Sequence, residues 1–479
     1  MRHDEIVSLS ATAQRHLIAR REISPIELIA ACLRRIEQLN PTLNAIVTLS
    51  EHALEDARAL EQRLARGENP GLLCGLPVGI KDVTPVGGLR TTFGSPLYAD
   101  YIPEEDAEVV RRLRQAGAII LGKTNCPEFA AGGNTFNAVF GRTRNPWNTG
   151  RSAGGSTGGG AVGLATGMIS LAEGTDLGGS LRIPASFCGM VGLRPSPGLV
   201  PTIPSDYLWD NLQVTGPMAR RAEDVALMLQ AIAGPSERWP SAQPNAGRDF
   251  IAAVAKGLAK KTRIAYNSDL AGIGVDTQLE GICRRAVWEL SREGVIVDEI
   301  DLNLSSGRKA FLALRGYWMV AHHYSRLDRL DQLGENVAGN IRAGLKVTVA
   351  ELAAAEEARG KIRSALINLF KTYDYLLTPC MAVPPFPVEQ NYPQTIAGKA
   401  MNNYIDWIAP TFVLSLTGLP VATVPCGLDQ QGLPVGLQIV GKPFGEEAVL
   451  ALAKVIQEAH PIGLPEVAAD SFNLNDSRG

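Results

Sequence analysis

Two glycine clusters joined by an apolar stretch constrain the fold of this chain more than any other feature of its sequence. Residues 154–160 read GGSTGGG and residues 174–180 read GTDLGGS. Glycine clusters serve where the backbone takes a positive φ or approaches another group closely. A flexible linker is excluded, because a linker does not carry a run of side chains that folding should bury. These side chains are Val162, Leu164, Met168, Ile169 and Leu171.

Short apolar runs and helical stretches alternate along most of the chain. The strand candidates are residues 78–80, 118–121, 169–172, 263–266, 295–300, 375–377, 421–424 and 435–440. The helix candidates are residues 105–116, 157–167, 276–293, 349–372 and 446–459. Such alternation is typical of a parallel sheet with helices on both faces. The sequence therefore predicts an α/β fold, a single large three-layer α/β/α domain with a central mixed, largely parallel twisted sheet covered by helices.

The first part of the chain reads as two helices. The tetrapeptide SPIE at residues 24–27 is a capping box with proline at the first helical position. We expect this helix to end at Asn40-Pro41 and a second, charge-rich helix to span residues 51–66. Residues 381–401 are rich in proline and aperiodic, which predicts a long loop that either connects elements in solvent or shapes a substrate site.

Charge and cysteine content narrow the class of protein. The 479 residues include 46 Lys+Arg and 49 Asp+Glu, a balance that argues against a nucleic-acid partner or a polybasic membrane anchor. Seven scattered cysteines predict buried free thiols in a reducing compartment rather than disulfides or a zinc site. The N-terminus does not read as a signal peptide, and no window has about 18 uninterrupted apolar residues. We therefore expect a soluble, cytoplasmic protein with no membrane contact.

Two familiar sites fit the glycine clusters poorly. A phosphate-binding loop would match Gly150 and Gly155, but Ser156 stands where the loop needs its lysine. A Ser-His-Asp triad would need a histidine, and none of the six histidines lies near either cluster in sequence. A G-x-S-x-G elbow is also missing around Ser156 and Ser180, so such a triad would depend on tertiary contacts alone.

Lys81 is a different candidate base. It ends the apolar stretch GLPVGIKD at residues 75–82, which reads as a buried strand. A lysine amine accepts a proton only when it is neutral, and burial favours the neutral form. The carboxyl end of a central parallel strand is also where active sites of open α/β sheets form. The alternative is a structural ion pair with Asp82 or another carboxylate.

Several long motifs together carry a family resemblance. Residues 154–192 closely resemble the signature of the amidase signature family of serine hydrolases, and Lys81 falls where that family carries its catalytic lysine. Similar motifs are GKTN at 122–125, NPW at 145–147, GPMAR at 216–220 and GLPVGLQIV at 432–440. The resemblance implies an N-terminal helical segment (1–70), a catalytic core (71–235), a variable substrate-shaping region (236–415) and C-terminal strands and a helix that complete one domain (416–479).

The resemblance also implies a Ser-cisSer-Lys triad. Ser180 takes the place of the nucleophile, and a bridging serine that follows a cis peptide bond links it to Lys81. Ser152 and Ser156 compete for the bridging place, and the family spacing of 24 positions before the nucleophile selects Ser156. Thr157 and Gly79 stand where the family usually has serine, and neither change removes a catalytic group.

An oxyanion site would complete the chemistry of amide hydrolysis. Consecutive backbone amides in the second cluster can supply it, those of Leu177, Gly178, Gly179 and Ser180. Asp176 can either hydrogen-bond the glycine loop or cap an ordinary turn, and we expect a structural role for it. We expect Arg182 to pair with a buried carboxylate rather than bind an acidic substrate.

The resemblance implies an amidase that cleaves small linear amides or anilides through an acyl-enzyme on Ser180, without a cofactor or metal, as a monomer or homodimer. Candidates for substrate contact are Gly132, Gly133, Phe136, Trp209, Trp318, Tyr404 and Trp407. Carbamate (urethane) or ester hydrolysis is an alternative, since the acyl-enzyme chemistry is the same. A glutaminase of the glutamyl-tRNA amidotransferase type is less favoured, because Ile183 follows Arg182 where that group commonly has glutamine. A catalytically idle binding module is the remaining alternative.

Overall fold

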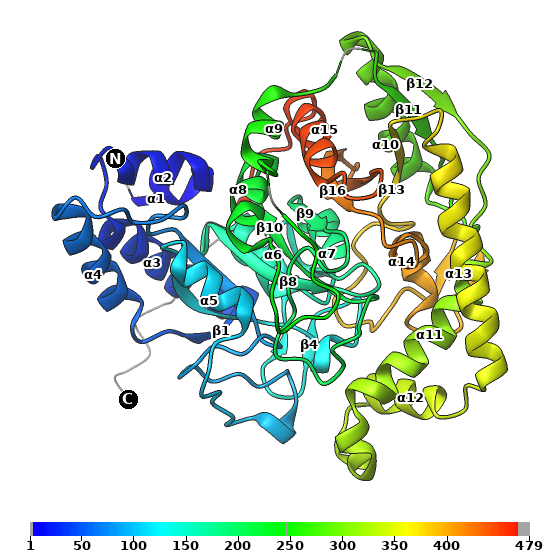
Figure 1. Cartoon of the computed structure of the whole chain (residues 1–479), viewed down its shortest axis with the longest axis horizontal. Coiled ribbons are helices and arrows are strands. Elements are labelled where there is room, and N and C mark those ends of the chain that lie inside the picture. The colour runs from blue at the N-terminus through cyan, green and yellow to red at the C-terminus, as the bar shows by residue number, and fades with distance from the viewer. Residues whose placement is uncertain (1–2, 246, 260, 468–479) are drawn as a thin grey trace, which may run out of the picture.

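A single sheet organises the computed structural model, which describes residues 3–245, 247–259 and 261–467 (Figure 1). In this part of the chain the sheet has 11 strands in the order β1-β3-β2-β8-β10-β9-β16-β17-β13-β11-β12. Their bounds are β1 Ile46–Leu49, β2 Pro77–Lys81, β3 Ile119–Thr124, β8 Leu171–Asp176, β9 Val191–Arg194, β10 Val214–Ala219, β11 Arg263–Tyr266, β12 Ile296–Glu299, β13 Tyr375–Pro379, β16 Val421–Leu428 and β17 Pro434–Val440. Short two-stranded ladders form from β4 Phe136–Asn137 with β5 Gly141–Arg142, β6 Arg144–Asn145 with β7 Asn148–Ser152, and β14 Thr395–Ile396 with β15 Lys399–Ala400.

The mixed α/β sheet is confirmed, but it is less parallel than the sequence predicts. Among the described strands, β3–β2, β2–β8, β13–β11 and β11–β12 are parallel pairs, and the other six neighbouring pairs of the sheet are antiparallel. Two of these antiparallel pairs, β16–β17 and β17–β13, join strands that the sequence indicates, and the other four involve β1, β9 and β10, which the apolar pattern did not indicate. Each of them pairs only antiparallel, and the glycine and proline of β10 hide its strand character in the sequence.

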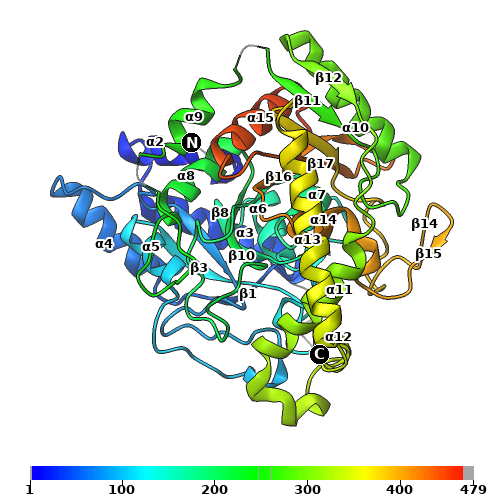
Figure 2. The same cartoon turned by 45° about the vertical axis from the view of Figure 1, so that its right-hand side comes forward.

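Helices cover the sheet on both faces (Figures 1 and 2). They are α1 His3–Ser8, α2 Ala11–Ala19, α3 Pro25–Leu43, α4 Ala53–Ala65, α5 Glu108–Gln115, α6 Gly158–Ala165, α7 Arg182–Cys188, α8 Ala222–Ile232, α9 Phe250–Lys256, α10 Thr277–Glu289, α11 Gly307–His322, α12 Glu335–Gly344, α13 Val349–Leu369, α14 Ala409–Ser415 and α15 Glu446–Ala459. Helices α6 and α7, which hold the glycine-rich segment, pack on each other and on the middle strands. Helices α8 and α15 form a second pair on the sheet, and α11, α12 and α13 gather at one side of it.

The N-terminal capping box is confirmed, but the end of its helix is not where the sequence predicts. Ser24 Oγ accepts from the Glu27 N–H at 3.1 Å, and the Ser24 N–H donates to Glu27 Oε2 at 2.7 Å. The helix continues through Pro41 to Leu43. It ends at Asn44, whose φ of 51° is left-handed, because Asn40 Oδ1 accepts the N–H groups just beyond that turn.

Two hydrophobic cores meet at the loop between β8 and α7. One core lies between the sheet and its helices and includes Leu181, while the other lies between the sheet and α11–α14. Leu177 packs against the second core, so the five residues from Leu177 to Leu181 bridge the two. The second glycine cluster is thereby held from both sides.

Two simpler expectations concern cysteines and membrane spans. All seven cysteines are buried and free, as the sequence predicts. Among the described residues, none of the helices combines the length and the apolar character that crossing a bilayer requires.

Gly79 offers a test of the packing around β2. A Cβ built on Gly79 would lie 2.7 Å from both Ile169 Cδ1 and Thr124 Cγ2, so a side chain there overfills the core. We predict that Gly79→Ala lowers the free energy of unfolding by about 1–3 kcal/mol. The matched control is Gly360→Ala in α13, where a Cβ meets nothing within 4 Å. It should leave stability unchanged or raise it by about 0.5–1 kcal/mol. Chemical denaturation of both variants measures the difference, and equal stability of Gly79→Ala and wild type would contradict the prediction.

Candidate active site

The amine of Lys81 is bound by two hydroxyl groups. Lys81 is the last residue of β2 and is fully buried. Its Nζ donates to Ser156 Oγ at 2.7 Å and to Thr175 Oγ1 at 2.9 Å. The neighbouring Asp82 carboxylate accepts from the Thr92 N–H instead. Of the two alternatives left open by the sequence, the structure therefore places Lys81 against a serine rather than in an ion pair with Asp82.

Burial changes the acidity of this lysine. It lowers the pKa of Lys81 to about 8, because the ammonium form loses its hydration inside the protein. Cys126, Glu173 and Asp176 act in the opposite direction, since negative charge nearby favours the ammonium form. A lysine with such a pKa is partly neutral near physiological pH, so it can accept a proton.

A second buried lysine, Lys123 on β3, was not singled out by the sequence. Burial lowers the pKa of Lys123 to about 8 as well. Its Nζ, however, donates to the Thr84 carbonyl oxygen and to Thr91 Oγ1, the latter at 3.0 Å. Burial alone thus does not distinguish the two lysines. Contact with Ser156 does, and that contact belongs to Lys81.

Ser156 lies at the centre of the first glycine cluster and is fully buried. The peptide bond between Gly155 and Ser156 is cis, as the family resemblance implied. Close approach of the backbone at Gly132 and Asn134 explains the glycine before Ser156, because a Cβ on Gly155 would lie 3.0 Å from the Gly132 carbonyl oxygen. Ser152, the rival for the bridging place, donates to Asn134 Oδ1 at 2.7 Å and accepts from the Gly154 N–H at 3.0 Å. Ser152 therefore holds the loop, and Ser156 contacts the lysine.

Ser180 lies in the turn that joins β8 to α7 and is only partly buried. Its carbonyl oxygen accepts from the Thr157 N–H at 3.2 Å, which ties the second glycine cluster to the first. Ser180 and Ser156 line the same cavity. The partly exposed serine and the buried one thus face a common space, with Lys81 behind Ser156.

The carboxylate of Asp176 holds the turn before Ser180. It accepts from the N–H groups of Gly179 at 2.9 Å and Leu181 at 3.2 Å. Arg182 and Arg194 form ion pairs with it at 3.0 and 3.2 Å, and all three side chains are fully buried. Burial alone would raise the pKa of Asp176, but the two guanidinium groups lower it well below its usual range. The structural roles predicted for Asp176 and Arg182 are confirmed.

The backbone of this turn requires glycine at position 179. Gly179 has a φ of 127°, and a Cβ there would lie 2.3 Å from Thr411 Oγ1. Thr411 Oγ1 donates to the Gly178 carbonyl oxygen at 2.5 Å. Because Gly179 already gives its N–H to Asp176, that amide is committed to the turn. The other three amides proposed from the sequence belong to Leu177, Gly178 and Ser180.

The cavity in front of the two serines is small, about 30 Å³. Its wall is mostly apolar and comes from the glycine loops, α11 and the segment near α14; the lining residues are Phe129, Ala130, Ala131, Gly132, Ser156, Thr175, Leu177, Gly178, Ser180, Gln213, Phe311, Arg315, Trp318, Met319, Tyr404 and Ile408. We call it the catalytic cavity. A neighbouring cavity of about 320 Å³ shares Phe129, Ala130, Thr175, Gln213 and Trp318 with it. This second space also has Phe93, Tyr98, Tyr101, His322 and His323 on its wall, and we call it the aromatic cavity.

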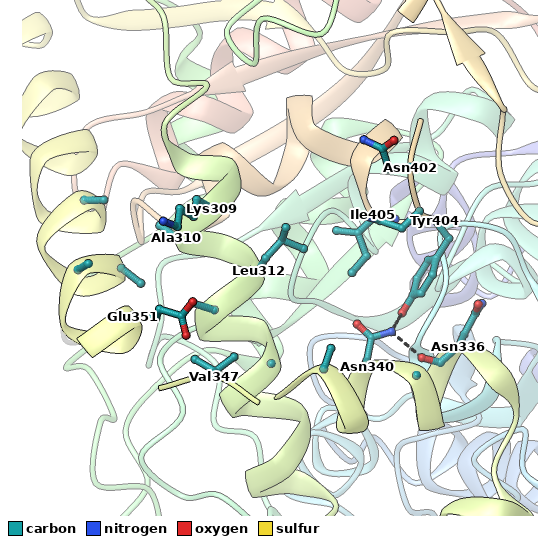
Figure 3. Close-up of a pocket in the computed structure, with 18 of the residues that line it drawn as sticks. Lys309, Ala310, Leu312, Asn336, Asn340, Val347, Glu351, Asn402, Tyr404 and Ile405 are labelled. Carbon is teal, nitrogen blue, oxygen red and sulfur yellow. Dashed lines mark hydrogen bonds between the residues drawn. The ribbon is translucent and has the colours of Figure 1, made fainter. Parts of the chain in front are cut away.

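A third and larger cavity, about 1010 Å³, lies between α11, α12 and α13 (Figure 3). Neither serine lines it, and it touches the catalytic cavity only through Tyr404, which lines both. Asn340 Nδ2 donates to the Tyr404 hydroxyl at 2.6 Å and so fixes this shared wall.

The aromatic residues proposed for substrate contact fall in different places. Trp318 and Tyr404 line the catalytic cavity, together with Gly132. Trp407 is fully buried, stacks on Phe187 and packs against Gly133, so these two candidates belong to the core. Phe136 lies in β4 under the Arg142 guanidinium, and Trp209 is 68% exposed. The structure therefore brings three of the seven candidates to the serines.

Helix α11 contributes a wall of the catalytic cavity that the sequence predicted only in part. Phe311, Arg315, Trp318 and Met319 all line the catalytic cavity, and only Trp318 was named. Their spacing of four, seven and eight residues from Phe311 corresponds to one face of a helix. That periodicity is present in the sequence, but residues 307–322 were not predicted to form a helix.

Among the described residues, no group of three or more His, Cys, Asp or Glu side chains is arranged to hold a metal ion.

Comparison with known proteins identifies the family of the chain. The chain is 35% identical to the acylamidase of Rhodococcus erythropolis over 95% of its own length and 96% of that protein. It is also 35% identical to a glutamyl-tRNA(Gln) amidotransferase subunit of Moorella thermoacetica, over 95% of this chain and 97% of the relative. The crystal structure of a bacterial aryl acylamidase superposes with a TM-score of 0.88 at 28% identity, over 95% of this chain and 97% of that one. Because the amidase family model matches residues 27–450, the chain belongs to the amidase family.

Proposed function

We propose that this protein hydrolyses the C–N bond of small linear amides or anilides through an acyl-enzyme on Ser180. The observation that carries the proposal is the 2.7 Å hydrogen bond from Lys81 Nζ to Ser156 Oγ, inside the protein and beside the turn of Ser180. Amide hydrolysis needs a nucleophile, a proton shuttle and an oxyanion site. All three can come from side chains and backbone amides of this chain.

The proton relay runs from Ser180 through Ser156 to Lys81. Neutral Lys81 accepts the proton of Ser156, and Ser156 accepts that of Ser180, whose oxygen attacks the carbonyl carbon. A hydroxyl group suits the middle place because it both donates and accepts. When the tetrahedral intermediate collapses, the relay returns the proton to the departing amine. Water then attacks the ester on Ser180 and gives a proton to the relay. The relay returns a proton to the Ser180 oxygen as the acid product leaves.

The negative charge on the carbonyl oxygen is to be stabilised by backbone amides. We assign this to the N–H groups of Leu177, Gly178 and Ser180, with Gly179 anchoring the turn through Asp176. Amides that are already oriented stabilise the transition state without reorganisation. The ion pairs of Asp176 with Arg182 and Arg194 keep this turn rigid.

Two observations support an anilide as the substrate class. The aromatic cavity adjoins the catalytic cavity, and its rings contact one another from Phe93 to Phe129 and His323. Proteins with names that include acylamidase are among the relatives and the structural neighbours. Carbamates and esters use the same acyl-enzyme chemistry and are expected as further substrates.

The seven free cysteines support a reducing, cytoplasmic setting.

A glutaminase of the amidotransferase type is the second candidate, because relatives with that name are 35% identical over almost the whole chain. A substrate panel separates the two functions. We predict that kcat/KM is highest for a 4-nitroanilide, measurable for a carbamate and an ester, and lowest for L-glutamine. Release of nitroaniline and of ammonia are the two readouts. Faster ammonia release from glutamine than nitroaniline release from any anilide would overturn this assignment.

The roles of the serines can be separated by single substitutions. We predict that Ser180→Ala lowers kcat by at least about 10³-fold and Ser156→Ala by about 10²–10⁴-fold, since each removes one step of the relay. Ser152→Ala is the matched control, because Ser152 is a buried serine of the same segment that hydrogen-bonds Asn134 instead. It should keep kcat close to wild type. A large loss in Ser152→Ala with normal folding, or activity retained in Ser180→Ala, would contradict the proposal.

The acidity of Lys81 predicts the pH profile. Protonated Lys81 cannot accept a proton, so kcat/KM for an uncharged anilide should rise with pH up to about 8 and level off above it. Below that pKa the rise should approach tenfold per pH unit. Melting temperatures over the same range serve as the control for unfolding. A profile that stays constant between pH 6 and 9 would show that another group is the base.

A further inference from the structure

Arg315 differs from the other residues that line the catalytic cavity. Among the lining residues it carries the only charge. It lies on α11 and is only 7% exposed, so its guanidinium group is largely removed from water. A guanidinium group carries its positive charge inside a protein as well as in water. The charge must therefore be compensated by neighbouring groups.

The protein groups around Arg315 are neutral. Its Nη1 donates to Asn340 Oδ1, and its Nη2 donates to the Tyr404 hydroxyl at 2.8 Å. The guanidinium also lies over the Tyr404 ring, 5.6 Å from the centroid. In the described part of the chain, none of the carboxylates lies within 4.0 Å of it as an ion-pair partner. A guanidinium group has five N–H donors, so these two hydrogen bonds leave it with further donors.

The other buried arginines nearby are treated differently. Arg182 and Arg194 share the Asp176 carboxylate at 3.0 and 3.2 Å, and neither of them lines the catalytic cavity. An uncompensated buried charge destabilises a fold, whereas a paired one is tolerated. The structure thus pairs the two arginines that support the loop with a carboxylate, whereas Arg315, which lines the same cavity as Ser180, has only neutral partners. This points to a ligand that supplies the anion.

Arg315 is held firmly in its place. Asn340 Nδ2 donates both to the Tyr404 hydroxyl and to the Asn336 carbonyl oxygen, which links the network to α12 (Figure 3). Bidentate recognition of a carboxylate requires such a fixed fork. The network therefore has the form of a preorganised anion site rather than of a mobile surface arginine.

The walls of the two adjoining cavities indicate which half of the substrate carries the anion. Trp318 belongs to the wall shared with the aromatic cavity, whereas Arg315 and Met319 line the catalytic cavity alone. The serines lie on the wall of the same small space of about 30 Å³. An aromatic amine therefore fits the aromatic cavity, and only a short acyl group fits at Arg315.

On the basis of the proposed function, we infer that the preferred substrates are anilides whose short acyl group ends in a carboxylate, and that Arg315 binds this carboxylate. The matched probes are the 4-nitroanilides of succinic acid and of 4-methylpentanoic acid. Their acyl groups have the same shape, since an isopropyl group replaces the carboxylate. We expect wild-type kcat/KM to favour the succinyl compound by about 10–100-fold, the range of a hydrogen-bonded ionic contact.

Substitution of Arg315 supplies the second comparison. Arg315→Met should lower kcat/KM for the succinyl anilide by about 10–100-fold and change that for the 4-methylpentanoyl anilide by less than about threefold. Lys309→Met removes the same charge from an exposed position of the same helix, and it should leave both rates at the wild-type value. A third probe is the butyryl amide of 4-aminobenzoate, in which the acyl group is uncharged and the carboxylate lies on the amine half. It should be cleaved no faster than the 4-methylpentanoyl anilide.

Each outcome bears on the inference separately from the proposed function. Wild-type preference for the 4-methylpentanoyl anilide or for the aminobenzoate probe overturns the carboxylate assignment, and this comparison does not depend on whether Arg315→Met folds. An equal loss on both anilides in a folded Arg315→Met overturns it as well. If the carboxylate assignment fails in either way, the proposed hydrolysis still holds as long as the wild type releases nitroaniline and Ser180→Ala does not. Activity that persists in Ser180→Ala would instead refute the proposed function itself.

Discussion

The hydrogen bond between Lys81 and Ser156 depends on the burial of an amine in a place where water does not hydrate it. The end of β2 provides that place, between the first glycine cluster and Thr175 of β8. Desolvation lowers the pKa of Lys81 to about 8, and the two hydroxyls satisfy its donors without adding a full negative charge. Lys123 is equally buried and burial likewise lowers its pKa to about 8, but its partners are Thr84 and Thr91. The proposed role of Lys81 therefore rests on its contact with a serine rather than on burial alone.

The glycine clusters make this contact possible by removing side chains from crowded positions. A Cβ on Gly158 would lie 2.3 Å from Thr135 Oγ1, and one on Gly174 would lie 2.6 Å from the side chain of Thr157. The same absence of side chains leaves backbone amides uncovered, and Asp176 then fixes one of them at Gly179. The turn of Ser180 is bounded by two hydrophobic cores. Close packing of the two clusters thus positions both serines and exposes the amides that an oxyanion would need.

The sequence predicts the central elements because local patterns specify them. The apolar strand that ends at Lys81, the capping box at Ser24 and the helix Glu446–Ala459 each have a signal within a few residues. Strand β10 has glycine and proline inside it, so only its pairing with β8 and β9 reveals it. The lining of the catalytic cavity was predicted incompletely for a related reason. Nothing local distinguishes Trp407, which is buried in the core, from Trp318, which lines the cavity.

Three buried charges illustrate how the structure separates support from chemistry. Asp176 is compensated by two arginines, so its charge is retained and its turn is rigid. Lys81 has no such compensation by direct contact, and it responds by a lowered pKa that makes proton transfer accessible. Arg315 also has only neutral partners, but a guanidinium group cannot neutralise itself. Of these three responses to burial, only the last leaves a charge for which the surrounding protein groups offer no counter-ion. Because Arg315 lines the same cavity as Ser180, we infer that a bound substrate supplies this counter-ion.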